Sequence, residues 1–584
     1  MKIALLGCPF WGTIYGPNYT LALLAALVKE AGHEPVVFDL NIELYNRVSE
    51  EDKQTYWDYE NHDAKYNRLD LLCDKYQSDM IEIFETIADG GFKAVAYSVT
   101  AFSSLMSIHM NTRIKARNPN LVSIFGGVNC FSKHSAGRYM EDPNIDLVCL
   151  GEAETVMGDL LGAIESGTWQ SGLKGFLVRN PREIIDGGAP EARTNLDLNP
   201  YPDYSLFDTS KYTTQNKYTT QFSRGCINRC TFCYEHMIHK RFRHRSARSV
   251  IGELKEIIQR TGVSNLYINF ADSLINGSIQ ELEAFCDTIL AEGLSVTWWG
   301  QAAVRRQMTR DLLLKMKRAG CSGVSWGIET GSDAVLGLMN KNTNADLIRQ
   351  VLRDGHEVGL LQNTNFIVGF PGERDGDFLQ TCAFLVENLP YLDTIGTTLL
   401  SIEKNAPLYQ GHKTYGIKDR DASIDWESTD GLNTLERRKA KNAILKRLIG
   451  NKYLGGVKGD TTVTDPYLDP LYNRTYNALM PLLREGRIKP FDKVALYGCG
   501  EWGRRFRTTL EANGIRTFAY LDSNPVKWGT EQEGIPIRDP AEMTAAEAGC
   551  KILIASSSRR AITDRLISLG LVEGQDFFAF NEVS

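Results

Sequence analysis

Short apolar runs alternate with amphipathic stretches over residues 1–165. The apolar runs are rich in Val, Ile, Leu and Phe, end in glycine or a polar turn, and predict five strands: Lys2–Gly7, Pro35–Asp39, Ala94–Val99, Val122–Gly127 and Asp146–Gly151. Between them, stretches such as Tyr19–Ala31 and Ser104–Ala116 have helical periodicity. Strands that alternate with helices indicate an α/β fold with a parallel, doubly wound sheet, whose ligands bind beyond the carboxyl ends of the strands.

The β-then-α pattern returns over residues 218–400, as a partial (β/α)6 barrel requires. Six strands are expected: Tyr218–Phe222, Asn265–Asn269, Val296–Ala302, Gly323–Gly327, Asn363–Val368 and Thr394–Leu400. Active sites of such barrels lie at the carboxyl ends of the strands. Residues 166–217 are expected to form a linker with hairpin character, in which Pro200 and Pro202 prevent a helix.

A small Rossmann-like domain is predicted over residues 491–584, after a helical connecting region at 401–490. Gly498, Gly500 and Gly503 form GxGxxG between a strand and a helix, and a second strand, Thr517–Leu521, ends in Asp522. This context is typical of nucleotide binding, with glycines for close phosphate approach and an acid for ribose hydroxyls. The domain is roughly half of a full dinucleotide fold, so hydride transfer is not expected. Binding of a nucleotide or a nucleotide-linked substrate, and a structural or docking role, are the alternatives.

Composition excludes several classes of function. The 584 residues suffice for several domains, and a net charge of −7 gives no electrostatic footprint for nucleic acid. The twelve cysteines lack a disulfide-type spacing pattern, which suits a reducing cytosol. No apolar run approaches the ~20 residues of a membrane span. We therefore expect a soluble, cytoplasmic protein with no membrane span and no nucleic-acid partner.

Three cysteines carry the strongest chemical signal. Cys226, Cys230 and Cys233 have the spacing CxxxCxxC, directly after an apolar stretch. Structural iron–sulfur and zinc sites normally close with four ligands, so three thiolates suit a [4Fe–4S] cluster that keeps one iron open to bind something. The alternative is a zinc site completed by His236 or His239.

The cysteine triplet resembles that of the radical S-adenosylmethionine (SAM) superfamily. The resemblance implies that SAM binds the open iron, and that one electron splits it into methionine and a 5′-deoxyadenosyl radical. Phe232 stands where the family has an aromatic residue whose backbone contacts adenine. Four later segments match family patterns in order: Ala271–Ser273, Gly300–Arg305, Gly327–Ser332 and Asn365–Glu373. The residues that these segments imply at the SAM site are Asp272, Gln301, Glu329, Ser332 and Val368.

The doubly wound domain followed by this core resembles the cobalamin-binding radical SAM family. The family has a flavodoxin-like N-terminal domain that holds the corrinoid. Gly126 and Gly127, with Gly151 and Glu152 of Gly-Glu-Ala-Glu, match its recurring pattern, which implies a place at the corrinoid. The DxHxxG motif of other cobalamin domains is absent, so no axial ligand is named. The alternative is a flavodoxin-like sheet that no longer binds a corrinoid.

Two further features have more than one interpretation. The basic segment His239–Arg248 is either a solvated face or a clamp for an anionic substrate or the SAM carboxylate. Asp272 and Glu373 are either site residues or helix caps.

Together these patterns predict a cobalamin-dependent radical SAM enzyme with a [4Fe–4S] cluster, SAM and cobalamin as cofactors. We expect it to methylate an unactivated carbon of a small molecule, for which a nucleotide-linked compound is one option. A reductant such as flavodoxin or ferredoxin would supply the electron. The alternatives are cyclisation or rearrangement, with or without cobalamin, and a cobalamin- or redox-sensing binding protein. The sequence identifies neither the substrate nor a catalytic residue.

Overall fold

The computed structural model of the protein places most of the chain. The residues that it describes are 1–10, 14–57, 68–404, 406–450, 482, 487–488, 493–512, 515–542, 551–554 and 559–579. They form two compact units. One comprises Met1–Ile227, Glu235–Ala302 and Lys315–Gly323, and the other comprises Asn228–Tyr234, Ala303–Leu314 and Val324–Ser584. No helix among the described residues is long and apolar enough to cross a membrane.

The N-terminal sheet has seven strands. Their order is β2 (Glu34–Asp39), β1 (Lys2–Gly7), β3 (Ala94–Ser98), β4 (Val122–Gly126), β5 (Leu147–Cys149), β6 (Phe176–Arg179) and β7 (Ile184–Asp186). The first five are parallel, in the 2-1-3-4-5 order of flavodoxin-like folds, which confirms the predicted doubly wound sheet. The antiparallel pair β6–β7 is the hairpin expected within residues 166–217, and it extends this sheet instead of standing apart as a linker.

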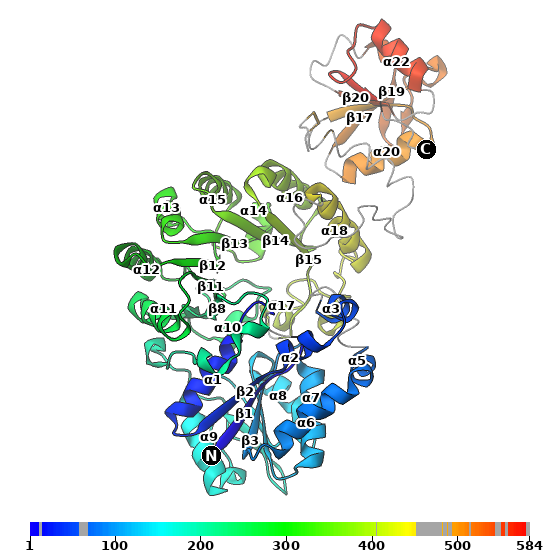
Figure 1. The fold of residues 1–584 in the computed structure, drawn as a ribbon. Helices are drawn as coiled ribbons and strands as arrows, with labels where there is room; N and C mark the ends of the chain where they lie inside the picture. Colours follow the sequence, from blue (N-terminus) through cyan, green and yellow to red (C-terminus); the bar gives the residue numbers. More distant parts are fainter. Residues whose placement is uncertain are drawn as a thin grey trace. The chain divides into compact units, whose positions relative to one another are not determined.

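Helices cover both faces of this sheet (Figure 1). On one face, α1 (Tyr19–Glu30) and α9 (Met157–Ser166) pack against Ile3 and Leu5 of β1. The other face is covered by helices that pack against Ala4 and Leu6. They are α2 (Leu40–Arg47), α6 (Gln77–Asp89), α7 (Ser104–Arg117) and α8 (Lys133–Tyr139). Alternate residues of β1 thus point to opposite faces and bury both, because side chains alternate along a strand.

An insertion after β2 packs against the loop that follows β1. The backbone N–H of Phe10 and the indole N–H of Trp57 donate to the side-chain oxygen of Asn41, at 3.1 and 2.9 Å. Phe10 has a φ of +73° and stacks on Tyr56, which ends α3 (Glu50–Tyr56). The insertion therefore braces a strained turn at the carboxyl end of β1. Its aromatic residues Tyr59 and Tyr66 lie outside the described residues.

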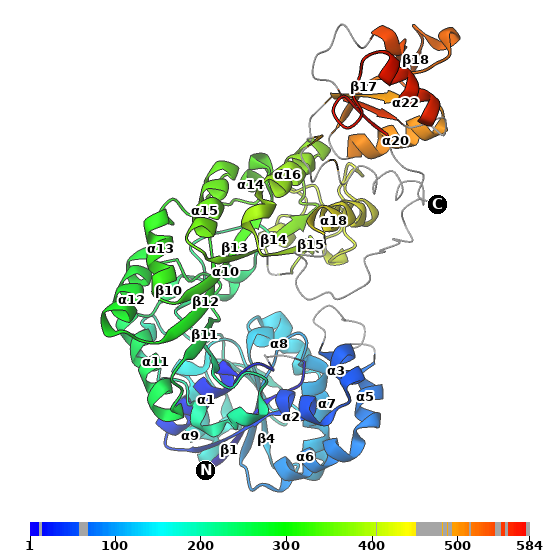
Figure 2. The ribbon, with the colours of Figure 1, turned by 45° about the horizontal axis from the view of Figure 1, so that its top comes forward.

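The second sheet contains the six strands predicted for the barrel. Their order is β8 (Lys217–Thr220), β11 (Leu266–Phe270), β12 (Val296–Ala302), β13 (Cys321–Glu329), β14 (Leu361–Val368) and β15 (Thr394–Leu399). The pairs β8–β11, β11–β12 and β14–β15 are parallel. Helices fill the intervals: α11 (Ala247–Thr261), α12 (Ile279–Glu292), α13 (Arg310–Arg318), α14 (Asp333–Leu338), α15 (Ala345–Glu357) and α16 (Asp375–Asn388). Figure 2 shows α11 and α12 side by side outside the first strands.

The described residues that directly follow β15 include both helices and turns. Over residues 401–404 and 406–450, α17 (Pro407–Gln410) and α18 (Leu435–Ile449) are separated by turns. Within these turns, Trp426 is fully buried and packs with Phe370 and Val335. The turns are therefore held by burial of Trp426. Residues 451–481 lie outside the described residues.

The C-terminal domain is a six-stranded sheet. Its order is β18 (Glu531–Gln532), β19 (Ile535–Arg538), β17 (Arg516–Leu521), β16 (Lys493–Tyr497), β20 (Lys551–Ile554) and β21 (Phe577–Ala579). All pairs except β18–β19 are parallel. The helices among its described residues are α20 (Glu501–Ala512), which directly follows β16 and the glycine loop, and α22 (Arg559–Ser568). The domain is thus an α/β domain with a mainly parallel sheet.

Candidate functional site

The three predicted metal ligands lie in one loop after β9 (Ser223–Arg224). Cys230 is buried, Cys226 and Cys233 are half-buried, and the Cys233 N–H donates to the Cys230 carbonyl at 3.2 Å. None of the described cysteines is in a disulfide. Among the described residues, no three His, Cys, Asp or Glu side chains are gathered as a metal site. The donor chemistry, three thiols within eight consecutive residues, nevertheless fits a [4Fe–4S] cluster, whose irons are held by cysteine thiolates.

Asp272 fixes the backbone that leads into the cysteine loop. Its side chain is 1% exposed and accepts the N–H groups of Phe222, at 2.9 Å, and of Ser223. The Ser223 hydroxyl donates to the carbonyl of Leu274 at 2.9 Å. Burial raises the pKa of Asp272 to about 6, against the lowering effect of these bonds. Asp272 thus anchors a strand end and does not cap a helix. Its predicted contact with SAM stays a prediction.

Arg224 and the two acids of the Gly151–Glu154 turn belong to a buried cluster of charged side chains. The Arg224 guanidinium lies 2.9 Å from Glu152 and 2.5 Å from Glu154, and both carboxylates are 5% exposed. Arg243 pairs with Glu152 through both terminal nitrogens, and His239 Nδ1 lies 3.0 Å from the same carboxylate. Burial raises the pKa of Glu152, but the bonds from Arg243 and His239 and the charge of Arg224 hold it well below its usual range. The predicted corrinoid residue Glu152 therefore has cationic partners from the protein itself.

The basic segment is only partly a solvated face. Lys240, Arg241 and Arg248 are exposed. Arg245 is buried instead, paired with Glu253, which also accepts from the Thr220 hydroxyl. Arg243 and Arg245 thus form buried ion pairs within the protein, so the segment is not a fully solvated face, and a role of its exposed basic residues in binding an anion stays a prediction. Because His239 faces Glu152, it is also a poor candidate for a fourth zinc ligand.

Predicted SAM residues lie at the ends of the barrel strands. Glu329 ends β13 with a φ of +70°, a strained backbone for a residue other than glycine. Its carboxylate lies 2.9 Å from Lys341 Nζ, which also donates to the carbonyl of Gly327 at 2.5 Å. Nothing in the residue pattern marked Lys341. Val368 is buried at the end of β14, and the side chain of Gln301 is exposed on β12.

Ser332 is placed by a helix start. Its hydroxyl accepts the N–H of Val335 at the beginning of α14 and donates to Asp377 at 2.9 Å. The residue is fully buried. Helix capping therefore accounts for Ser332 structurally, and its contact with SAM stays a prediction.

The second half of the cysteine loop is held by the turn after α14. The Thr231 N–H donates to the carbonyl of Met339 at 3.0 Å, and the Asn340 amide donates to the carbonyl of Arg229 at 2.9 Å. The Phe232 ring lies 6.4 Å from that of Phe370, edge to face. The predicted adenine-contacting residue is thus rigidly placed by its backbone neighbours and its ring.

Glu373 forms a buried ion pair instead of capping a helix. Its carboxylate is 2% exposed and lies 3.0 Å from Lys441 of α18. Burial raises its pKa, against the lowering effect of Lys441. The pair attaches α18 to the turn after β14.

The paired glycines after β4 allow two strand ends to approach closely. The Val99 N–H donates to the Gly126 carbonyl at 2.7 Å. Gly127 has a φ of +105°, and a Cβ there would lie 2.6 Å from the carbonyl oxygen of Val99. A Cβ on Gly151 would lie 3.2 Å from Pro190. The predicted corrinoid glycines therefore have a demonstrable packing role at this edge, and their ligand role stays a prediction.

The glycine loop of the C-terminal domain has the expected division of roles. Gly498 has a φ of +114°, and a Cβ on Gly503 would lie 1.8 Å from the Gly498 carbonyl oxygen, whereas a Cβ on Gly500 would have no atom of the described residues within 4 Å. Asp522, the predicted ribose acid, lies 2.9 Å from Lys527 Nζ and accepts the Cys499 thiol at 2.8 Å. Asp522 thus already has protein partners, while no described residue fills the space beside Gly500.

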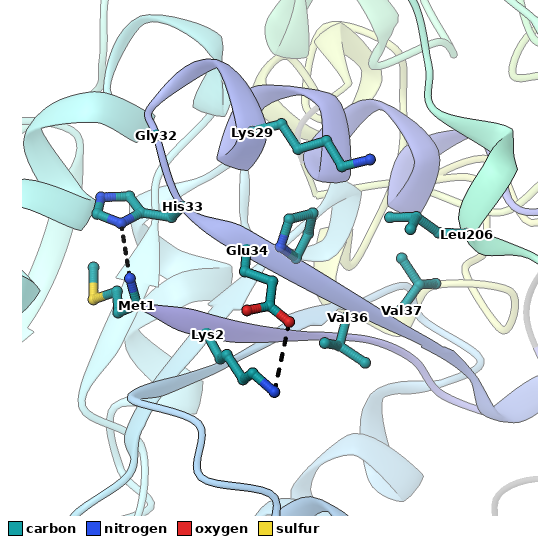
Figure 3. Close-up of a pocket in the computed structure, with 10 residues that line it drawn as sticks. Met1, Lys2, Lys29, Gly32, His33, Glu34, Val36, Val37 and Leu206 are labelled. Atoms are coloured by element: carbon teal, nitrogen blue, oxygen red, sulfur yellow. Dashed lines mark hydrogen bonds and ion pairs between the residues drawn. The ribbon is translucent and has the colours of Figure 1, made fainter.

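A surface groove lies at the opposite edge of the N-terminal sheet. Figure 3 shows it between the amino ends of β1 and β2, with Lys29 of α1 above it. Its lining includes an ion pair of 3.5 Å between Lys2 and Glu34. Since ligands of such sheets bind at the carboxyl ends of the strands, we assign this groove no part in the site.

Residues 220–385 match the model of the Radical SAM superfamily. The chain is 26% identical over 271 residues to the anaerobic magnesium-protoporphyrin IX monomethyl ester cyclase of Synechocystis, covering 46% of this chain and 54% of the cyclase. This chain thus spans about half the length of that relative. It is 22% identical over 388 residues to the cytidylyl-2-hydroxyethylphosphonate methyltransferase of Streptomyces wedmorensis, covering 60% and 68%.

A solved structure shares the fold over most of both chains. The radical SAM methyltransferase TsrM from Kitasatospora setae, solved with cobalamin and a [4Fe–4S] cluster bound, superposes with a TM-score of 0.57 at 15% identity. The superposition covers 88% of this chain and 98% of TsrM. At this identity the likeness establishes the fold.

Proposed function

The chain belongs to the radical SAM superfamily and has the fold of its B12-binding members, and we propose that it is a cobalamin-dependent methyltransferase. Its substrate would be an unactivated carbon of a small molecule. The observation that carries the proposal is the CxxxCxxC loop within the matched domain, anchored at the carboxyl ends of the barrel strands. The family assignment disfavours a zinc site and a pure sensor, because neither requires such a domain.

Cys226, Cys230 and Cys233 would hold the cluster. When bound, the cluster supplies the electron that splits SAM, and cobalamin supplies a methyl group; the protein supplies orientation and a dry site. The chain's own contribution is rigidity. Asp272 holds the N–H groups of Phe222 and Ser223, so the backbone before Cys226 is fixed by a buried carboxylate.

SAM would lie along the ends of β13 and β14. Glu329, Ser332 and Val368 are the residues that we assign to it, and the predicted role of Gln301 stays a prediction. The strained backbone of Glu329 supports the assignment, since such strain concentrates at functional sites. Lys341 orients the Glu329 carboxylate through a 2.9 Å ion pair, so we add it as a positioning residue.

The corrinoid would lie at the carboxyl edge of the N-terminal sheet. The strand order changes direction between β1 and β3, and ligands of such sheets bind beside that point. Gly126, Gly127 and Gly151 lie at the ends of β4 and β5 on the same edge, where the absence of side chains lets the strand-end loops pack closely together.

The C-terminal domain would bind a nucleotide-linked substrate or product. The space beside Gly500 that no described residue fills supports this, because a phosphate approaches the backbone most closely there. One relative is named for a cytidylyl substrate, which fits the same chemical class. To accept a hydrogen bond from a ribose hydroxyl, Asp522 would have to give up its ion pair with Lys527.

Cyclisation is the second candidate, since another relative is named as a cyclase. The test is anaerobic incubation of the reconstituted protein with SAM whose methyl group is labelled. Formation of 5′-deoxyadenosine together with label in a product supports methyl transfer. Formation of 5′-deoxyadenosine with an unlabelled product, in the presence of substrate, supports cyclisation or rearrangement.

A further inference from the structure

We infer that Glu152 and Glu154 are positioning residues of the cysteine loop, and that Glu152 is not a contact of the corrinoid. Both belong to the turn after β5, at the edge where the corrinoid is proposed to bind. Their partner Arg224 stands two residues before Cys226. The inference rests on the proposed function, because it concerns how the two cofactor regions are joined.

Most of the hydrogen-bonding capacity of Glu152 is already used. A carboxylate has about four acceptor positions. One oxygen of Glu152 accepts from Arg224 and Arg243, each at 2.9 Å, and the other accepts from Arg243 and lies 3.0 Å from His239 Nδ1. With three arginine N–H donors in place, the His239 ring beside the second oxygen and the side chain 5% exposed, Glu152 is enclosed by protein groups.

Arg224 is fixed at both its backbone and its side chain. Its backbone pairs with Arg243 in the short antiparallel ladder of β9 and β10 (Arg243–His244), so Glu152 holds both strands of that ladder. Its guanidinium forms one ion pair with Glu152 and another with Glu154, so the charges of the two arginines in the cluster are balanced by those of two acids.

The chain turns toward Cys226 immediately after this clamp. Gly225 has a φ of +82°, and a Cβ there would lie 2.8 Å from the carbonyl oxygen of Arg241. The position of Arg224 therefore determines the position of Cys226, and the turn after β5 determines the position of Arg224. A shift of the turn on corrinoid binding would be passed to the first cluster ligand.

The variants Glu152→Gln and Glu154→Gln keep the side-chain shape and remove the charge. The matched control is Asp146→Asn, which breaks another largely buried ion pair of the same sheet, with Lys115 at 2.8 Å, away from Arg224. The measurements are amide hydrogen exchange of a peptide covering residues 222–227, the dissociation constant of hydroxocobalamin, and the electron paramagnetic resonance spectrum of the reduced cluster with and without SAM.

We expect exchange in residues 222–227 to rise at least tenfold in both Gln variants and to stay unchanged in Asp146→Asn. The cluster spectrum with SAM should shift or broaden in the Gln variants alone, while hydroxocobalamin affinity stays within about threefold. Unchanged exchange overturns the inference. A normal spectrum with a tenfold or greater loss of corrinoid affinity overturns it as well, and makes the two acids corrinoid contacts. If the wild type binds no iron, the proposed function fails, and the exchange data still decide the role of the two acids.

Discussion

Replacement of Asp272 by alanine tests whether one buried carboxylate holds the entrance to the cysteine loop. The change leaves the N–H groups of Phe222 and Ser223 without their acceptor. Each orphaned buried donor costs about 1–3 kcal/mol, so the loss is about 2–6 kcal/mol. Removing a carboxylate whose pKa burial raises from 3.8 to about 6 returns about 3 kcal/mol at neutral pH. Global stability should thus change by an amount between a gain of about 1 kcal/mol and a loss of about 3 kcal/mol, while the loop loses its local anchor.

Hydrogen exchange separates the local from the global effect. We expect the amides of residues 222 and 223 to exchange at least tenfold faster in Asp272→Ala, since each ~1.4 kcal/mol of local opening is a factor of ten. Asp393→Ala is the matched control, because Asp393 accepts the N–H of Gln362 at 2.8 Å, at the amino end of β14. It should affect that segment alone. Equal protection of residues 222 and 223 in wild type and Asp272→Ala would show that Asp272 does not anchor this segment.

The remaining predictions concern pH, the C-terminal glycine loop and the pair on α18. The pKa of Asp272 in the folded protein is raised to about 6, so ionisation of this carboxyl lowers the free energy of unfolding as pH rises from about 4 to about 6. When the pH is lowered from 7 to 5, the free energy of unfolding of the wild type should therefore rise by about 1 kcal/mol relative to that of Asp272→Asn. No such rise would contradict the raised pKa. Gly503→Ala should destabilise the C-terminal domain by about 1–3 kcal/mol in thermal unfolding, because its Cβ would lie 1.8 Å from a carbonyl oxygen, whereas Gly500→Ala should change little; equal effects would contradict this. Lys441→Met should cost about 3–5 kcal/mol at pH 8 and less at pH 5, where Glu373 can take up a proton, and a loss independent of pH would contradict the raised pKa.

Local patterns were enough to predict the elements. The strands of both large sheets follow from short apolar runs that end in glycine, and GxGxxG marked the turn between β16 and α20. These elements depend on residues that are neighbours in the chain, so the period of the apolar positions and the turn residues predict them. The turns around Trp426 were not predicted, because they are ordered by tertiary packing and lack a period of their own.

The partners of the site residues could not be predicted in the same way. Asp272 and Glu373 were recognised as polar residues at strand ends, yet the groups that they hold come from distant segments. Arg224 carried no motif, and Glu152 was assigned to a ligand because its pattern matched one. Only the fold brings them together, since ion pairs between distant residues leave no trace in a single sequence.

The most direct test of the account is the cofactor content of the protein purified anaerobically with hydroxocobalamin supplied. Iron, sulfide and corrinoid are quantified per chain, with Cys226→Ala, Cys230→Ala and Cys233→Ala as controls. We expect about four irons and about one corrinoid in the wild type, with iron lost in each variant. Four irons without corrinoid would contradict the methyl-transfer proposal, and no iron would contradict the cluster itself.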